Sequence, residues 1–286
     1  MSEPTSTSKR ILVADDEPDV CALLMNALED AGYEVECAHD GAQALEKLVQ
    51  GRYDLVLMDV WMPRLTGLEV LAKMRDRPSP PRVIVMTGDN TPVTAIAALR
   101  EQAWQYISKP FTMAVLRERV ARALVARSSA PPIEVVSLKT DWIELLVPCE
   151  REAAERIRDF LMQLEADLPE DVRDSVGDAF RELLMNAIEW GGDFDPAQRV
   201  RISAIRAKKV LIYRIADPGA GFRMEDLLHA AVSNAPEDPT GHLAARERLA
   251  LRPGGFGILL ARAIADELIY NEKHNEVVFM KYLKER

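Results

Sequence analysis

The stretch Asp54-Leu-Val-Leu-Met-Asp59 places four apolar residues between two aspartates. A short apolar run of this kind predicts a strand buried in a sheet. Asp59 ends the run, which predicts a functional carboxylate at the carboxyl end of a strand. Two similar apolar runs precede this run and two follow it. The five expected strands are Arg10–Ala14, Tyr33–Ala38, Asp54–Asp59, Val83–Met86 and Trp104–Ile107.

Amphipathic segments alternate with these strands. The expected helices are Val20–Ala31, Ala42–Gln50, Gly67–Arg75, Thr91–Arg100 and Phe111–Arg127. Short apolar strands between helices indicate a parallel sheet that is covered on both faces. Residues 9–127 are therefore predicted to form a doubly wound α/β domain with a five-stranded parallel sheet, in the flavodoxin-like arrangement.

Polar residues follow four of the strands. Asp15 and Asp16 follow the first, Asp59 ends the third, Thr87 follows the fourth and Lys109 follows the fifth. Because ligands of an open α/β sheet bind at the carboxyl ends of its strands, we expect these side chains to converge. Crowded carboxylates need a cation, and hard oxygen ligands favour magnesium. One carboxylate can then attack phosphorus, while the hydroxyl and the ammonium bind the transferred oxygens.

Each of these residues also has an ordinary explanation. Asp15 or Asp16 could cap the helix that begins near Pro18. Asp59 could simply terminate a strand, and Lys109 is one lysine among many. The order of all the polar residues on successive strand ends is what favours a phosphoryl site.

Four segments around these positions resemble the response-regulator receiver family. They are Lys9-Arg-Ile-Leu-Val-Ala-Asp-Asp-Glu-Pro18, Leu57-Met-Asp-Val-Trp-Met-Pro63, Val85-Met-Thr-Gly88 and Tyr106-Ile-Ser-Lys-Pro110. The resemblance implies that Asp59 accepts phosphate from an upstream sensor histidine kinase. It also implies that Asp16 and Asp59 ligate Mg²⁺, with Asp15 in support and the carbonyl of Trp61 as a further ligand.

The same resemblance implies two conformational features. Thr87 and Tyr106 would form the pair that moves on phosphorylation, and the Lys109–Pro110 peptide bond would be cis. The stretch Ala103-Trp104-Gln105 departs from the family, which more often has a Gly-Ala-Asp-like sequence there. The departure affects the loop before the fifth strand and leaves the acidic pocket intact.

The composition of Arg127-Ser-Ser-Ala-Pro-Pro132 predicts a linker, which we place at residues 128–134, and a second domain at 135–286. Its helices and strands are more segregated than in the first half, which predicts an α/β sandwich with a mixed sheet packed on helices. A Pro-, Asp- and Gly-rich stretch at Asp217–Gly257 is expected to hold at most one short helix. The expected strands are Asp141–Val147, Val200–Ala207, Val210–Ala216 and Glu276–Tyr282, and the expected helices are about Glu150–Leu164, Asp171–Glu189 and Gly257–Asp266.

Three polar side chains share one stripe of the expected helix Asp171–Glu189. Glu182, Asn186 and Glu189 are spaced i, i+4 and i+7, which puts them on one face. Such a stripe could be ordinary solvated surface. An amide oxygen between two carboxylates is also a reasonable magnesium site.

Two glycine-rich segments follow. In Asp217-Pro-Gly-Ala-Gly-Phe222, Gly219 and Gly221 permit close backbone approach, and Asp217 could accept a hydrogen bond from an adenine amine; the segment could also be an ordinary turn. In Arg252-Pro-Gly-Gly-Phe-Gly-Ile258, the glycines precede a helix whose free N–H groups could bind an anion, or the segment could be a flexible loop. These glycines are Gly254, Gly255 and Gly257.

The order of these motifs resembles the ATPase fold shared by histidine kinases, gyrases, Hsp90 chaperones and mismatch-repair proteins (the GHKL, or Bergerat-type, fold). Residues 135–286 are most similar to its anti-sigma-factor serine kinases, through Glu182-Leu-Leu-Met-Asn-Ala-Ile-Glu189 and Asn275-Glu-Val-Val-Phe-Met-Lys281. The resemblance implies that Asn186 binds ATP-bound Mg²⁺, that Asp217 reads adenine and that Glu182 is the general base. It places Gly254, Gly255 and Gly257 near the phosphates and Gly219 and Gly221 in the nucleotide pocket. Trp190 departs from the family, which more often has His there.

Two functions remain open at this point. In the first, the second domain phosphorylates a serine or threonine of an anti-anti-sigma (STAS-type) partner, under the control of Asp59 phosphorylation. In the second, it is a non-catalytic, ATP-gated switch that binds a sigma factor or another partner. An autophosphorylating histidine kinase is the poorer interpretation, because none of the four histidines lies on a helix between the receiver and the Asn186 helix.

Composition narrows the setting of the protein. With 36 Lys and Arg against 46 Asp and Glu, the net charge of −10 disfavours direct nucleic-acid binding. Cys21, Cys37 and Cys149 are too far apart in sequence to indicate a zinc knuckle or a redox pair, which suggests a reducing compartment. The polar N-terminus and the lack of an 18-residue apolar run predict no signal peptide, no membrane span and a cytoplasmic protein. A homodimer is possible.

Overall fold

The computed structural model describes residues 8–75, 77–88, 91–125, 131–139, 141–165, 167–223, 230–231, 234, 238, 240–248 and 255–283. Two compact units divide the chain, Met1–Ala130 and Pro131–Arg286. Within the described part of the chain, no helix is both long and apolar enough to cross a bilayer.

The first unit is a five-stranded parallel sheet with the strand order β2-β1-β3-β4-β5. Its central strand, β3, is buried along its whole length, which explains its continuous apolar sequence. The predicted parallel α/β fold is confirmed. The strands are β1 (Arg10–Ala14), β2 (Glu34–Ala38), β3 (Leu55–Asp59), β4 (Arg82–Thr87) and β5 (Gln105–Ser108).

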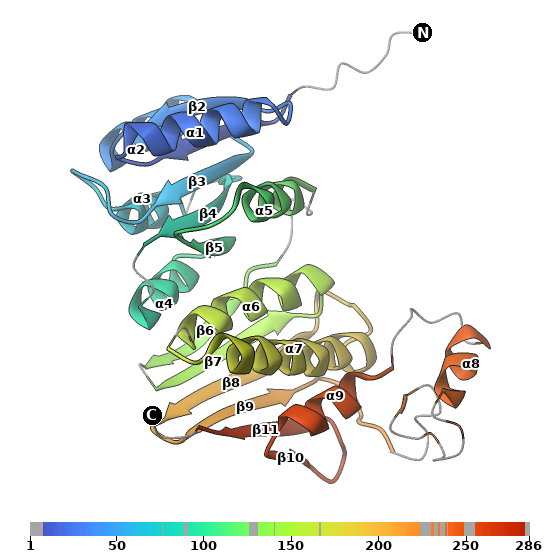
Figure 1. Ribbon diagram of the computed structural model, residues 1–286. Coiled ribbons are helices and arrows are strands. Elements are labelled where there is room, and N and C mark those ends of the chain that lie inside the picture. The colour runs from blue at the N-terminus through green and yellow to red at the C-terminus, as the bar shows by residue number, and fades with distance from the viewer. Residues whose placement is uncertain are drawn as a thin grey trace, which may run out of the picture. The chain divides into compact units, whose positions relative to one another are not determined.

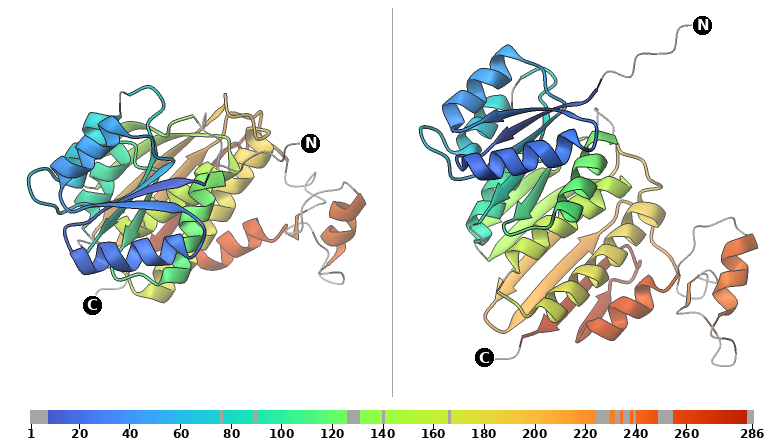
Figure 2. Two further views of the ribbon diagram at one scale, coloured as in Figure 1. Left: turned by 90° about the horizontal axis from the view of Figure 1, so that it is seen from above. Right: turned by 45° about the horizontal axis from the view of Figure 1, so that its top comes forward.

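Five helices cover the two faces of this sheet (Figures 1 and 2). The alternation of side chains along β1 sends Ile11 and Val13 into the core under α1 and α5, together with Leu24 and Leu116 of those helices. The helices α2, α3 and α4 lie over the opposite face. The helices are α1 (Pro18–Glu29), α2 (Gly41–Gln50), α3 (Gly67–Met74), α4 (Pro92–Arg100) and α5 (Met113–Val125).

The second unit is a six-stranded sheet with the order β10-β11-β9-β8-β7-β6. The predicted sandwich of a sheet packed on helices is confirmed, and every neighbouring pair of strands in this sheet is antiparallel rather than mixed in direction. Two strands, β6 and β10, were not expected from the sequence. The strands are β6 (Glu134–Lys139), β7 (Trp142–Pro148), β8 (Arg199–Ala207), β9 (Val210–Ala216), β10 (Glu267–Tyr270) and β11 (Glu276–Tyr282).

Three helices, α6 (Arg151–Leu164), α7 (Glu170–Asn186) and α9 (Gly257–Ile264), pack on one face of this sheet (Figure 1). An aromatic stack joins α7 to the sheet: the ring centroids of Phe180 and Tyr213 are 4.9 Å apart, and those of Tyr213 and Phe279 are 6.2 Å apart. These buried rings hold the middle of α7 against β9 and β11. A further short helix, α8 (Gly241–Arg248), lies in the long segment between β9 and α9.

The last turn of the α7 segment is a π-helix, Ala187–Gly191. A π turn bonds residue i to residue i+5, so it rotates the residues that follow relative to an α-helical stripe. The predicted single stripe of Glu182, Asn186 and Glu189 is therefore interrupted after Asn186.

Candidate functional sites

The acidic pocket of the first unit forms where β1, β3 and β5 end. The ammonium of Lys109 donates to Asp15 Oδ2 at 2.6 Å and to Asp59 Oδ1 at 2.7 Å. The other oxygen of Asp59 accepts a hydrogen bond from the backbone N–H of Trp61 at 2.7 Å. The sequence therefore predicted correctly that these strand ends meet.

The two carboxylates that Lys109 contacts are both buried. Asp15 is fully buried and Asp59 is 5% exposed. Burial raises the pKa of the Asp59 carboxyl above its ordinary value, although its hydrogen bond with Lys109 acts in the opposite direction. For Lys109, burial opposes the charged form, but the hydrogen bonds to Asp15 and Asp59 prevail and its pKa is raised.

The charges in this pocket fit a divalent cation. One ammonium faces two buried carboxylates, which leaves a net negative charge beside oxygen ligands of the kind that Mg²⁺ prefers. Among the residues described, no three side chains of His, Cys, Asp and Glu already converge on one point. Asp16, predicted from the sequence as a ligand with Asp59 and with Asp15 in support, is exposed, whereas Asp15 and Asp59 are buried.

Two further expected residues of the first site lie on β4 and β5. Thr87 is buried, and its carbonyl accepts a hydrogen bond from the backbone N–H of Lys109 at 2.7 Å. Tyr106 is also buried, at 1% exposure. The Lys109–Pro110 peptide bond is cis, which confirms the expectation.

The second unit contains a pocket of about 340 Å³ between α7, α9 and the ends of β9 and β11. Its walls include six of the residues predicted from the glycine and polar motifs. They are Glu182, Asn186, Asp217, Gly221, Gly255 and Gly257. Gly219 is adjacent, since its N–H donates to Asp217 Oδ1 at 2.8 Å. Gly254 lies outside the described residues.

The start of α9 approaches α7 closely. A Cβ placed on Gly257 would lie 2.8 Å from Glu182 Oε2 and 3.4 Å from Asn186 Nδ2. A methyl group at this position would displace the Glu182 side chain and would contact Asn186. Glycine here lets the N-terminus of α9 reach the polar stripe of α7, and the first N–H groups of a helix have no partner within the helix itself.

The loop after β9 is anchored on the other side of the pocket. The N–H of Asp217 donates to the carbonyl of Asn275 at 2.9 Å, and the side chain of Asn275 donates to the carbonyl of Gly219 at 3.1 Å. Gly221 has a φ of +87°, and a Cβ there would collide with the carbonyl of Lys273. Burial raises the pKa of the Asp217 carboxyl, with the Gly219 N–H acting against the shift.

Glu189 does not line this pocket, contrary to the predicted stripe. The π turn rotates it away and brings Trp190 and Gly191 to the wall instead. An aromatic group that the motifs did not indicate also contributes: the ring of Phe222 lies 5.9 Å from Tyr270 and 5.3 Å from His274. In the sequence, the segment Asn275–Lys281 was the one sign that the turn between β10 and β11 contributes to the pocket wall.

Each of the two units matches a known protein family. The family model "Response regulator receiver domain" matches residues 11–121, and the model "Histidine kinase-like ATPase domain" matches residues 147–281. The chain is 30% identical over 188 residues to the transcriptional regulatory protein PrrA of Mycobacterium tuberculosis, over 66% of this chain and 81% of PrrA. It is 40% identical over 121 residues to the response regulator MprA of Mycobacterium ulcerans, over 42% of this chain and 52% of MprA.

Among solved structures, a CheY-like receiver domain protein of Methanospirillum hungatei is 32% identical, with a TM-score of 0.40 over 41% of this chain and 94% of that one. A receiver domain implies an upstream histidine kinase as its partner. The matched relatives, the matched domains and the two pockets lead to one identification. The chain belongs to the response regulators, and it joins a receiver domain to a histidine kinase-like ATPase domain as its output.

Proposed function

We propose that the second domain is an ATP-dependent protein serine/threonine kinase that acts on an anti-anti-sigma partner of the STAS type. Phosphorylation of Asp59 in the receiver controls it. The observation that supports this most directly is that Glu182 and Asn186 line one pocket with the glycine start of α9. A candidate base, an amide ligand and an anion-binding helix end thereby share one space.

In this proposal each residue of the second pocket has its own role in ATP binding or in phosphate transfer. Asp217 accepts a hydrogen bond from the adenine amine, and the glycine-flanked start of α9 binds phosphate oxygens. Asn186 would hold Mg²⁺, which offsets the charge of the phosphates when it is bound. Glu182 takes the proton of the acceptor hydroxyl. The hydroxyl oxygen bonds to the γ-phosphorus, the bond from that phosphorus to the β–γ bridging oxygen breaks, and ADP leaves.

The receiver acts through its own nucleophile. An oxygen of Asp59 bonds to phosphorus as the bond to the donor, a phosphohistidine or acetyl phosphate, breaks. The ammonium of Lys109, already 2.7 Å from Asp59 Oδ1, can follow the new negative charge. Thr87 would bind another of the transferred oxygens, and Asp15, Asp16 and the carbonyl of Trp61 would complete the Mg²⁺ site.

The test is phosphate transfer from labelled ATP to a candidate anti-anti-sigma protein. Glu182→Gln should lower transfer by about 100-fold or more while ATP binding persists. Asp178→Asn is the matched control, because Asp178 is a carboxylate one turn earlier on α7 that pairs with Arg158. Transfer that is absent, or that does not depend on Glu182, contradicts the kinase. ATP-dependent retention of the partner without phosphoprotein would instead support the non-catalytic anti-sigma switch.

A further inference from the structure

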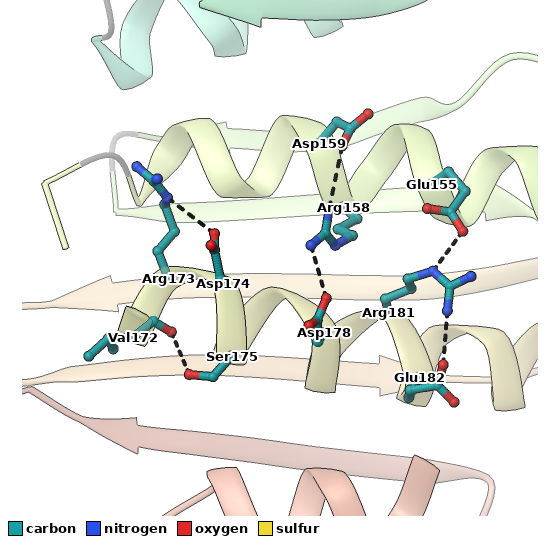
Figure 3. A network of polar contacts seen from close by, with 10 residues as sticks. All are labelled: Glu155, Arg158, Asp159, Val172, Arg173, Asp174, Ser175, Asp178, Arg181 and Glu182. Carbon is teal, nitrogen blue, oxygen red and sulfur yellow. Dashed lines mark hydrogen bonds and ion pairs between the residues drawn. The ribbon is translucent and has the colours of Figure 1, made fainter. Parts of the chain in front are cut away.

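Arg181 precedes Glu182 on α7, and its guanidinium joins two carboxylates from different helices (Figure 3). Its Nη1 donates to Glu182 Oε1 at 2.8 Å, and its Nε donates to Glu155 Oε1 of α6 at 2.6 Å. A guanidinium is a rigid planar fork. The bond to Glu155 therefore fixes the direction from which Arg181 meets Glu182.

The two oxygens of Glu182 have different surroundings. Oε1 is the acceptor of the Arg181 hydrogen bond. Oε2 lies toward the start of α9, where it is the atom that a Cβ on Gly257 would meet at 2.8 Å. Both Glu182 and Gly257 line the pocket. One oxygen is thus anchored on the α6 side, and the other is held toward the space that the proposed reaction uses.

We propose that Arg181, itself held by Glu155, is a positioning residue that fixes Glu182 Oε1 so that Oε2 faces the acceptor hydroxyl. The inference rests on the kinase function proposed above. A general base must lie within hydrogen-bond reach of the proton that it removes. A glutamate has several rotatable bonds, and holding one oxygen in place removes the cost of ordering them at each turnover.

A simpler role for Arg181 would be to tie α6 to α7. The molecule contains a matched control for that role in Arg158 of α6, whose Nη2 donates to Asp178 Oδ1 of α7 at 2.9 Å (Figure 3). This bridge joins the same two helices one turn before Glu182. Arg158→Ala removes a helix-to-helix ion pair of the same kind without removing a partner of Glu182.

The experiment uses the full chain, Mg-ATP and the anti-anti-sigma protein of the test above. Arg181→Ala should lower kcat by about 10-fold to 100-fold, because misplacing a base by an ångström costs about that much. The KM for ATP should stay within about twofold, since the lost interaction acts on the chemical step. Arg181→Lys should recover only part of kcat, because an ammonium keeps the charge but lacks the fork. Arg158→Ala should leave kcat and KM within about twofold.

A double mutant separates positioning from general stability. Adding Arg181→Ala to Glu182→Gln should change kcat by less than about twofold, because residues that act as a unit are not additive. A full additional loss would overturn the positioning role. Should Arg181→Ala unfold, Glu155→Gln serves in its place, and it should lower kcat severalfold with an unchanged KM.

The two possible failures have different results. If the wild-type protein transfers no phosphate in a Glu182-dependent way, the kinase proposal fails and this inference fails with it. If the wild-type protein is active and Arg181→Ala is as active as Arg158→Ala, only the positioning role is overturned.

Discussion

The two pockets of this protein are assembled from different kinds of element. In the receiver, the reactive side chains follow the ends of strands in one parallel sheet and are already bonded to one another through Lys109. In the ATPase domain, the walls come from a helix, a loop after a strand, the start of a second helix and a distant turn. A site on strand ends is positioned by sheet register, whereas a site between helices and loops depends on how those parts pack.

The pockets also differ in where their charges are satisfied. The Asp59 carboxylate is bonded inside its own pocket, to Lys109 and to the Trp61 N–H. The carboxylate of Glu182 is bonded away from its pocket, to Arg181, which is in turn bonded to Glu155 of α6. The receiver pocket should therefore respond most to changes of charge, and the ATPase pocket most to changes of shape.

The largest effect is expected at the receiver nucleophile. Asp59→Asn should reduce labelling by acetyl phosphate by more than about 100-fold, because the nucleophilic oxygen is replaced by a neutral amide. Labelling is measured by phosphate-affinity electrophoresis. Asp54→Asn is the control, since Asp54 lies just before the same strand and pairs with Lys9 instead. ATP binding by the second domain should be unchanged in both, and labelling of Asp59→Asn would refute the assigned role.

A change of shape should affect the ATPase pocket next most strongly. Gly257→Ala places a methyl group 2.8 Å from Glu182 Oε2 and 3.2 Å from Glu182 Cβ, so the Glu182 side chain must shift away from the start of α9. ATP affinity measured by calorimetry should fall by about 10-fold, corresponding to about 1.4 kcal/mol. An unchanged affinity would mean that ATP does not use this helix start.

A third prediction concerns Glu165, a buried carboxylate of the ATPase domain that does not line the ATPase pocket. Burial raises the pKa of Glu165 to about 7 from an ordinary 4.5, even though Arg206 donates to it at 2.6 Å. Burial outweighs the ion pair here, because Asp167 binds the same guanidinium. The folded state then holds a proton more tightly than the unfolded chain, so stability falls as pH rises from about 4.5 to 7.

Glu165→Gln should remove this dependence. Between pH 5 and pH 8 the unfolding free energy of the wild-type protein should drop by about 1–3 kcal/mol more than that of the variant. Chemical denaturation at the two pH values measures the difference. Arg206 keeps Asp167 as a partner in the variant, so a new unpaired charge is avoided. Parallel pH profiles for the two proteins would contradict the raised pKa.

The smallest effect is expected where the receiver pocket is open. A Cβ on Gly88 would meet no atom of the described residues within 4 Å. Gly88→Ala should therefore leave acetyl phosphate labelling within about twofold, as for a surface substitution away from packed groups. A large loss would show that the space beside Thr87 is filled during phosphorylation, and the contrast with Gly257 would then disappear.

The sequence alone predicted the receiver almost completely. Its apolar strand runs, the helices between them and the acids, threonine and lysine at strand ends all follow local rules, because the carboxyl ends of parallel strands share one edge of a sheet. It also identified most of the ATPase pocket, since Glu182, Asn186 and Asp217 lie in recognisable motifs and the structure brings them together.

Only the tertiary structure decided the rest. The edge strand β10 is four residues long and pairs with β11, and the edge strand β6 pairs with β7. The π turn has no local signal, yet it replaces Glu189 by Trp190 at the pocket wall. Cys21 and Cys37 looked unrelated in sequence, but the Sγ of Cys37 lies 3.7 Å from the carbonyl oxygen of Cys21.

The contact that holds Glu182 in place could not be predicted from the sequence either. Arg181 is its neighbour in sequence, but Glu155 comes from another helix, and no spacing rule relates residues 26 positions apart on different elements. Sequence periodicity determines which face of a helix is polar. Which partner that face meets, and therefore which oxygen of Glu182 remains available, depends on the packing of α6 and α9 against α7.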